Sequence, residues 1–115
     1  MSDYPIHQSN VPLFVAIPAG VGTQYSPAQN VEEAISYSVQ FIWSSGSALS
    51  GSIYLEASND GVNFTQIQQT VLAISGASGS HMINVEKHSY SYFRLSCNIT
   101  GGSATIDARS NTKSK

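Results

Sequence analysis

Hydrophobic and polar residues alternate with a period of two over much of this chain, which is the pattern of β-strands with one buried face. The clearest run covers residues 35–43, where a large side chain occupies every second position. These side chains are Ile35, Tyr37, Val39, Phe41 and Trp43. Each contributes about 1.5–3 kcal/mol when buried, so the run predicts a strand that anchors the core.

A second alternation, over residues 52–58, predicts the first strand of a β-hairpin. The sequence Asn-Asp-Gly at residues 59–61 ends it. Asp-Gly is a strong signal for a tight turn, because glycine accepts positive φ and aspartate can bond its own downstream amides. We expect the second strand of the hairpin over residues 62–67, beginning with Val62 and Phe64.

Further strands are expected at residues 13–17, 70–74, 81–85, 90–99 and 104–109. Pro12 and Pro18 bound the first of these, as prolines do at a sheet edge. Loops are expected at 19–30 and 44–50, and a hairpin turn at 100–102, because these segments are rich in glycine and serine. No segment has the i, i+3, i+4 spacing of apolar residues that predicts a long helix.

About eight short strands without a helix predict an all-β fold. Because hairpins connect most of them, we expect a single antiparallel β-sandwich of the jelly-roll type. The expected organisation is an N-terminal arm (1–10), a sandwich domain (11–109) and a flexible C-terminal tail (110–115). A chain of 115 residues can bury about two-thirds of its unfolded surface, enough for a core without metal or disulfide.

The composition excludes several classes of function. Only 10% of the residues are charged and the net charge is −2, so no basic stripe is available for nucleic acid. No apolar run approaches the roughly 20 residues that span a membrane, and the first residues do not resemble a secretory signal. We therefore expect synthesis in a cytoplasm and no membrane insertion. Cys97 is the one cysteine, and its place in an apolar alternation predicts a buried thiol.

Candidate catalytic and metal-binding residues form no recognisable motif. His7, His81 and His88 do not have the spacing of metal ligands, and residues 59–61 alone offer too few oxygens for calcium. No Gly-x-Ser-x-Gly elbow or phosphate-binding loop is present. We expect no catalytic, cofactor or metal site, and a protein that is not an enzyme.

Two carboxylates keep a glycosidase open as a distant alternative, because such an enzyme needs two converging carboxyl groups. These are Glu56 and Asp107, both on expected solvent faces. A cross-strand ion pair of Asp107 with Arg109 or Arg94 is the simpler interpretation.

Three tyrosines, Tyr54, Tyr90 and Tyr92, alternate onto faces that the pattern exposes to solvent. Tyrosine offers a large contact area at a low entropic cost, so such residues indicate either a subunit interface or a platform for stacking sugars. The low charge favours the interface.

The runs at residues 37–43 and 51–64 resemble small β-rich virion structural proteins encoded by bacteriophages. The similarity continues through 84–85, 92–95 and 101–109, and it covers about residues 31–113. The resemblance implies a β-sandwich in the virion, and it leaves open whether the place is head decoration, vertex, spike base or tail. We expect a protein associated with the capsid, as a decoration, vertex or spike-base protein. Its partners would be other copies of itself and phage capsid proteins, and residues 1–10 and 19–30 are the expected docking segments.

The hairpin pattern Ser-x-Asp-Gly-x-x-aromatic at residues 58–64 also recurs in discoidin-like and carbohydrate-binding sandwiches. The alternative function is therefore a carbohydrate-binding module for adsorption to a host surface glycan. Tyr54, Tyr90 or Tyr92 would then stack on the sugar.

Overall fold

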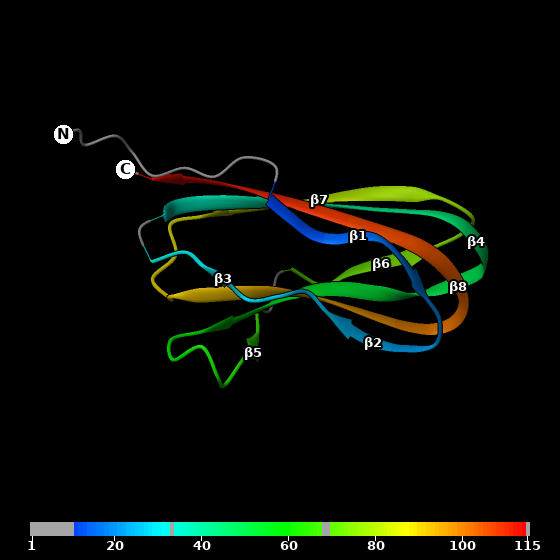
Figure 1. Cartoon of the computed structure of the whole chain (residues 1–115), viewed down its shortest axis with the longest axis horizontal. Helices are drawn as coiled ribbons and strands as arrows, with labels where there is room; N and C mark the ends of the chain where they lie inside the picture. The colour runs from blue at the N-terminus through cyan, green and yellow to red at the C-terminus, as the bar shows by residue number, and fades with distance from the viewer. Residues whose placement is uncertain (1–10, 33, 68–69, 115) are drawn as a thin grey trace.

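The computed structural model describes residues 11–32, 34–67 and 70–114, which form eight β-strands and no α-helix (Figure 1). The strands are β1 (Val11–Ala19), β2 (Gly22–Tyr25), β3 (Gln29–Asn30), β4 (Ala34–Ser58), β5 (Thr65–Gln66), β6 (Leu72–Ser75), β7 (Gly79–Glu86) and β8 (Tyr92–Ser114). All of their pairings are antiparallel, which confirms the predicted fold class. Among the described residues there is no helix long and apolar enough to cross a membrane.

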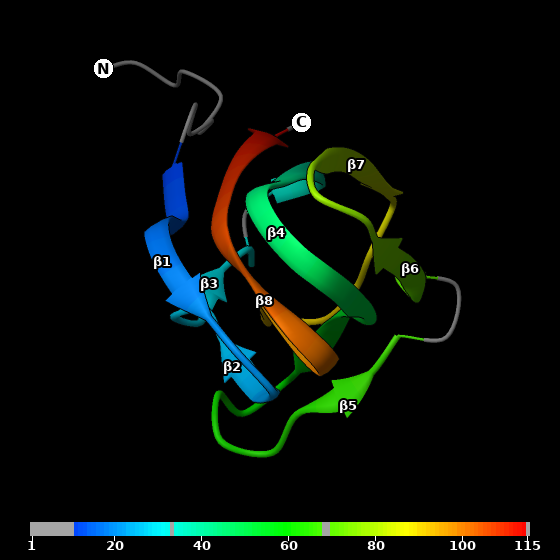
Figure 2. The ribbon, with the colours of Figure 1, turned by 90° about the vertical axis from the view of Figure 1, so that its right-hand side faces the viewer.

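Two long strands, β4 and β8, organise the molecule. They pair with each other from Ala34↔Ser114 to Ser58↔Tyr92, and both turn back at the same end of the molecule (Figure 1). The first layer contains β1, the C-terminal half of β8, the N-terminal half of β4, and β7. The second layer contains β2 and β3, the other halves of β8 and β4, and then β5 and β6. The sandwich is therefore one ribbon folded over on itself, as the view along its length shows (Figure 2).

A glycine-rich corner makes this folding possible. Of the nine glycines in the chain, all except Gly61 lie where a strand or connection passes between the layers. The backbones approach so closely there that a Cβ atom on Gly102 would lie 2.2 Å from the carbonyl oxygen of Ser47. Where β4 meets the connection between β6 and β7, the amide of Gly46 donates a hydrogen bond of 2.7 Å to the carbonyl of Ala77.

Two predictions are therefore wrong, the loop at residues 44–50 and the hairpin turn at 100–102. Both segments belong to continuous strands, and the β4–β8 register shifts between Ser44 and Gly51. Glycine and serine are typical of turns, but they also occur where β-bulges bend a strand. The local sequence does not distinguish the two cases.

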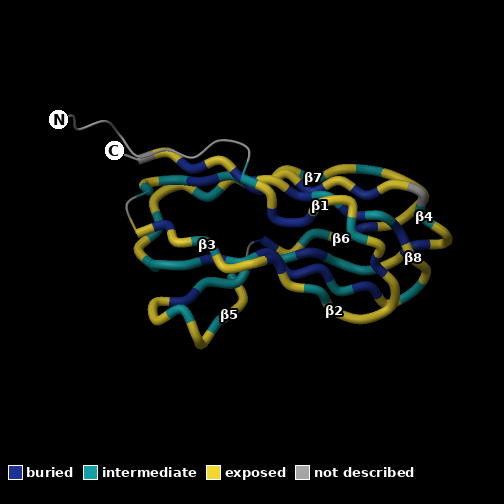
Figure 3. The backbone as a smooth tube through the Cα atoms, in the orientation of Figure 1, coloured by how far each residue is buried: buried dark blue, intermediate teal, exposed yellow. Residues whose placement is uncertain are grey.

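The core lies between the layers (Figure 3), and most of the predicted inward faces are confirmed. Tyr37, Val39, Phe41 and Trp43 of β4 are buried. The inward residues of β8 are also buried: Phe93, Leu95, Cys97, Ile99, Ala104, Ile106 and Ala108. Burial raises the pKa of the Cys97 thiol to about 11.

One predicted core residue, Ile35, is 37% exposed. The β4–β8 register shifts between Ala34 and Ser36, and this irregularity takes Ile35 out of the inward row.

Three other expectations about the margins of the sandwich also need correction. Residues 19–30 are not a loop, because β2 and β3 in this segment pair with β8. Residues 110–114 are not a tail, since β8 continues to Ser114 with Ser110 and Thr112 buried. Polar edge strands lack the alternation that would reveal them in the sequence. The expected arm at residues 1–10 lies outside the described residues.

The predicted hairpin forms, but its second strand begins later than expected. Glu56 pairs with Gln66 and Ala57 with Thr65, so the loop runs over residues 59–64. Val62 lies in this loop and is 78% exposed.

Candidate binding face

Large side chains gather on the outer face of the second layer. On β4, Tyr54 and Glu56 alternate with buried residues and so point away from the core. On β8, Tyr92, Arg94 and Ser96 do the same. Tyr25, at the end of β2, and Phe64, just before β5, complete the group through their contacts with Arg94. We call Tyr25, Tyr54, Glu56, Phe64, Tyr92 and Arg94 the aromatic face.

The centre of the aromatic face is an ion pair between neighbouring strands. Glu56 lies directly opposite Arg94 in the β4–β8 register, and the arginine Nε donates to the Glu56 Oε1 at 2.6 Å. The guanidinium carbon lies 4.1 Å from the centroid of the Tyr25 ring and 4.3 Å from that of Phe64. Cation–π contacts on two rings and a charge-assisted hydrogen bond therefore hold Arg94 in place. Its side chain is 27% exposed, against 12% for Glu56.

Two tyrosines flank this ion pair on its side nearer the corner. Tyr25 and Tyr54 lie on either side of Ser96 in the same cross-strand row, and Ser96 is fully buried although it points outward. Partial burial raises the pKa of Tyr54, and the nearby carboxylate of Glu56 raises it further. An ordinary tyrosine pKa of about 10 already keeps the hydroxyl protonated at neutral pH, so this upward shift leaves Tyr54 a hydrogen-bond donor.

The structure brings two of the three predicted tyrosines, Tyr54 and Tyr92, to this face. Tyr92 packs against the hairpin loop, where a Cβ atom on Gly61 would lie 3.3 Å from its ring. Tyr90 lies elsewhere: its hydroxyl is 2.6 Å from that of Tyr37, and its ring stacks on His88 with centroids 4.8 Å apart.

The local sequence pattern does not identify two residues of the aromatic face, Tyr25 and Phe64, as members of a surface site. Tyr25 lies in the segment expected to be a loop, and Phe64 lies in the segment expected to be the second strand of the hairpin. Tyr25 is also 69 positions before Arg94, and no local pattern connects residues that far apart.

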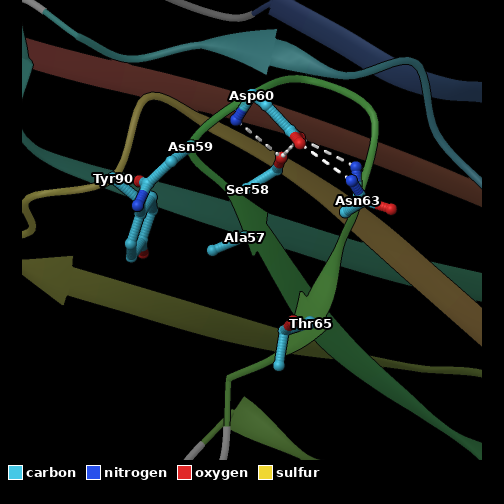
Figure 4. Close-up of a pocket in the computed structure, with 7 residues that line it drawn as sticks. All are labelled: Ala57, Ser58, Asn59, Asp60, Asn63, Thr65 and Tyr90. Carbon is cyan, nitrogen blue, oxygen red and sulfur yellow. Dashed lines mark hydrogen bonds between the residues drawn. The ribbon is translucent and has the colours of Figure 1, made fainter.

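A separate open pocket of about 400 Å³ lies at the hairpin loop (Figure 4). It is lined by Ala57, Ser58, Asn59, Asp60, Asn63, Thr65 and Tyr90. The Asp60 carboxylate accepts hydrogen bonds of 2.8 Å from the amides of Val62 and Asn63, from the Asn63 side chain and from the Ser58 hydroxyl. These bonds hold the pKa of Asp60 well below its usual range, the two backbone amides contributing most. Asp60 thus organises the loop, as the sequence predicted, and its oxygens are already occupied.

The carboxylates considered as a glycosidase pair do not meet. Glu56 lies on the outer face of the second layer and Asp107 on that of the first layer, where it accepts a 2.8 Å hydrogen bond from the amide of Ala16. Neither ion pair expected for Asp107 is present among the described residues: Arg94 pairs with Glu56 on the other side of the molecule, and no ion pair joins Asp107 to Arg109. Within residues 11–32, 34–67 and 70–114, no three His, Cys, Asp or Glu residues gather as a metal site would require.

The described histidines are held by internal contacts. His81 Nε2 lies 2.7 Å from the carbonyl oxygen of Ala73, and His88 Nδ1 lies 3.2 Å from that of Tyr90. His7 lies outside the described residues.

No protein-family model matches this chain, and no curated sequence is similar to it. Solved structures do resemble it in fold. The SPBc2 prophage-derived protein YomS matches with a TM-score of 0.57 and 12% identity, over 99% of this chain and 98% of that one. The PBSX exported protein XepA matches with a TM-score of 0.58 and 10% identity, over 96% of this chain and 37% of XepA.

A structure described as a CBM4 matches with a TM-score of 0.53 and 8% identity, over 79% of this chain and 60% of that one. At these identities the likeness concerns the fold alone. The fold that these proteins share with this chain is a β-sandwich.

Proposed function

We propose that this protein is a non-enzymatic structural component of a bacteriophage particle, and that it docks onto neighbouring particle subunits through the aromatic face. The observation that carries the proposal is the Arg94–Glu56 pair with the rings of Tyr25 and Phe64 against the guanidinium. Tyr54 and Tyr92 lie next along the same outer face of β4 and β8. Tyrosine and arginine are enriched at the centres of protein interfaces, and they dominate binding energy there. The end-to-end similarity of the fold to prophage-derived YomS supports the phage context.

The geometry of the face favours tight docking. Binding normally costs about 0.5–1.5 kcal/mol for each flexible side chain that becomes ordered. Arg94 is already fixed by one carboxylate and two rings, so little of this cost remains for it. Tyr25 is still 49% exposed, which leaves apolar ring surface for a partner to bury.

Mass spectrometry of purified particles, produced from the genome that encodes the chain, tests this function. We expect the protein in the particles at a fixed ratio to the major capsid subunit. Tyr25→Ala should lower that ratio, because it removes an exposed ring of the aromatic face. Thr105→Ala, on the outer face of the first layer, is the matched control and should leave the ratio unchanged. Absence of the wild-type protein from the particles would refute the proposal.

Carbohydrate binding is the second candidate function, and the same face supports it. Flat aromatic rings beside an ion pair of zero net charge can stack on a sugar ring and hydrogen-bond its hydroxyls. The similarity in fold to the CBM4 structure agrees with this alternative.

A glycan array distinguishes the two functions. Binding to a bacterial polysaccharide that Tyr54→Ala weakens, without a place in the particle, would favour the carbohydrate-binding module. An array without any bound glycan would count against it.

A further inference from the structure

The sandwich ends in four sheet edges, and three of them are poor templates for another strand. In the first layer, β1 carries Pro12 and Pro18, and its register with β8 is broken twice between Pro12 and Ile17. Asp107 also caps the β1 amide of Ala16. In the second layer the edges consist of short strands, β2 with β3 on one side and β5 with β6 on the other. Prolines, bulges and shortness are the usual means by which proteins protect an edge.

The fourth edge, β7, has none of these protections. It runs for eight residues without proline or lysine, and its pairing with β4 is regular from Ser36↔Glu86 to Trp43↔Gly79. Among the residues that the structure describes, β4 is its one strand partner. Near its first residues, His81 approaches β6 through the carbonyl of Ala73, so the open part of the edge is residues 82–86.

Apolar surface accompanies this open edge. Met82 points outward from the first layer and is 59% exposed. Beside it, a groove of about 360 Å³ lies between β6 and β7, and Leu72, Ile83 and Val85 contribute to its lining. A strand added at β7 would satisfy the free backbone groups and would cover Met82 and part of the groove.

We propose that β7 is a self-association edge, at which the β7 strands of two copies pair antiparallel about a two-fold axis. Antiparallel pairing of identical strands is two-fold symmetric, so this one edge supplies both halves of the contact. The charges permit it. With the axis at Met82, Ile83 or Asn84, Glu86 lies opposite Ser78, Ser80 or Met82 respectively, and Lys87 lies opposite Ala77, Gly79 or His81. None of these registers opposes like charges, which would destabilise the pairing.

Edge pairing of this kind is separate from docking through the aromatic face. The aromatic face belongs to the outer surface of the second layer, whereas β7 is an edge of the first layer. A dimer can therefore still present both aromatic faces to other partners. Loss of the dimer and loss of incorporation into particles are independent outcomes.

Sedimentation velocity of the full chain tests the proposal. A strand pair buries little area, so we expect a monomer–dimer equilibrium between about 10 μM and 1 mM. Met82→Lys and Asn84→Lys place like charges close to the two-fold axis, and each should weaken association about tenfold or more. Both positions are exposed, and circular dichroism checks that the variants fold. Val15→Lys on β1, where the wild-type residue is 57% exposed, is the matched control.

Amide exchange locates the contact directly. Protection of β7 amides should rise with protein concentration, while protection of β1 amides stays constant. The proposal is refuted if the wild type remains monomeric throughout that range, or if Val15→Lys weakens the dimer and the two β7 variants do not. A foreign strand as the natural occupant would appear as a wild-type monomer, and this too refutes self-association.

Discussion

Asp60 shows how one residue can fix the shape of a whole loop. Its carboxylate holds the amides of Val62 and Asn63, so the ionised form is favoured and its pKa lies below the unfolded value of about 3.9. A group whose pKa is lowered on folding contributes stability above its unfolded pKa. That contribution is lost as the pH falls towards the folded pKa. The Asp-Gly pattern predicted this role from the sequence.

We therefore predict that the amide chemical shifts of Val62 and Asn63 stay constant on acidification from neutral pH to about pH 3. Their titration midpoint should lie clearly below that of an ordinary aspartate, because protonation must break the bonds to the carboxylate. Asn63→Ala removes the side-chain donor and should raise the midpoint. Asp60→Asn should abolish the titration. A wild-type midpoint near 3.9 would contradict this account.

Arg94 marks the limit of sequence reasoning at the residue scale. The alternation correctly placed Arg94 and Tyr54 on an outer face. It did not identify the ion-pair partner, because Glu56 and Arg94 are 38 positions apart and meet through register alone. Once the β4–β8 register is known, the pair follows immediately. Long-range register is what the local pattern lacks.

At the scale of the element, β4 and β8 are much longer than an ordinary strand of about five or six residues. Glycine and serine lie near the middle of each of these strands, so the sequence favours the prediction of two ordinary strands joined by a loop. The structure shows a bent strand instead, because the glycines let four neighbouring backbones bend together at one corner. The inward faces were predictable from alternation, whereas the continuity of the strands was not.

The corner glycines should differ sharply in their tolerance of a side chain. Gly102 has a φ of 75°, and an added Cβ would meet the Ser47 carbonyl, so Gly102→Ala should destabilise the protein by more than about 2 kcal/mol. Gly76 has a φ of 89° but open space around it, so Gly76→Ala should cost about 1 kcal/mol. Urea denaturation measures both.

Gly20→Ala is the control for this series. Gly20 has no positive φ and no atom within 4 Å of an added Cβ, so the substitution should be close to neutral. Equal effects at all three positions would show that the corner is not packed as described.

At the scale of the whole molecule, the two layers share their central strands. The first layer contains Val39 and the second contains Leu55, yet both residues belong to β4 and both are fully buried. Because β4 and β8 form the centre of both layers, neither layer can unfold without disrupting the other. The sandwich should therefore unfold as one cooperative unit.

Native-state hydrogen exchange checks this cooperativity. We predict that the amides of Val39 and Leu55 exchange with the same free energy, equal to that of global unfolding. Refolding should be slow, in milliseconds to seconds, because β4 must find β8 across a long stretch of chain. A markedly lower exchange free energy in one layer would mean that the layers open separately.

The placement of β1 beside β8 also has a mechanical consequence. Val11, at the start of β1, pairs with Ser110 near the end of β8, so the start of β1 and the C-terminal part of β8 lie at the same end of their shared ladder, the end away from the corner. A tension that pulls these two segments apart acts across the β1–β8 ladder and breaks its hydrogen bonds one after another. The β1–β8 pairing should therefore open by sequential unzipping under such a tension. A particle that had to resist tension through this protein would need to bind the outer faces of the two layers.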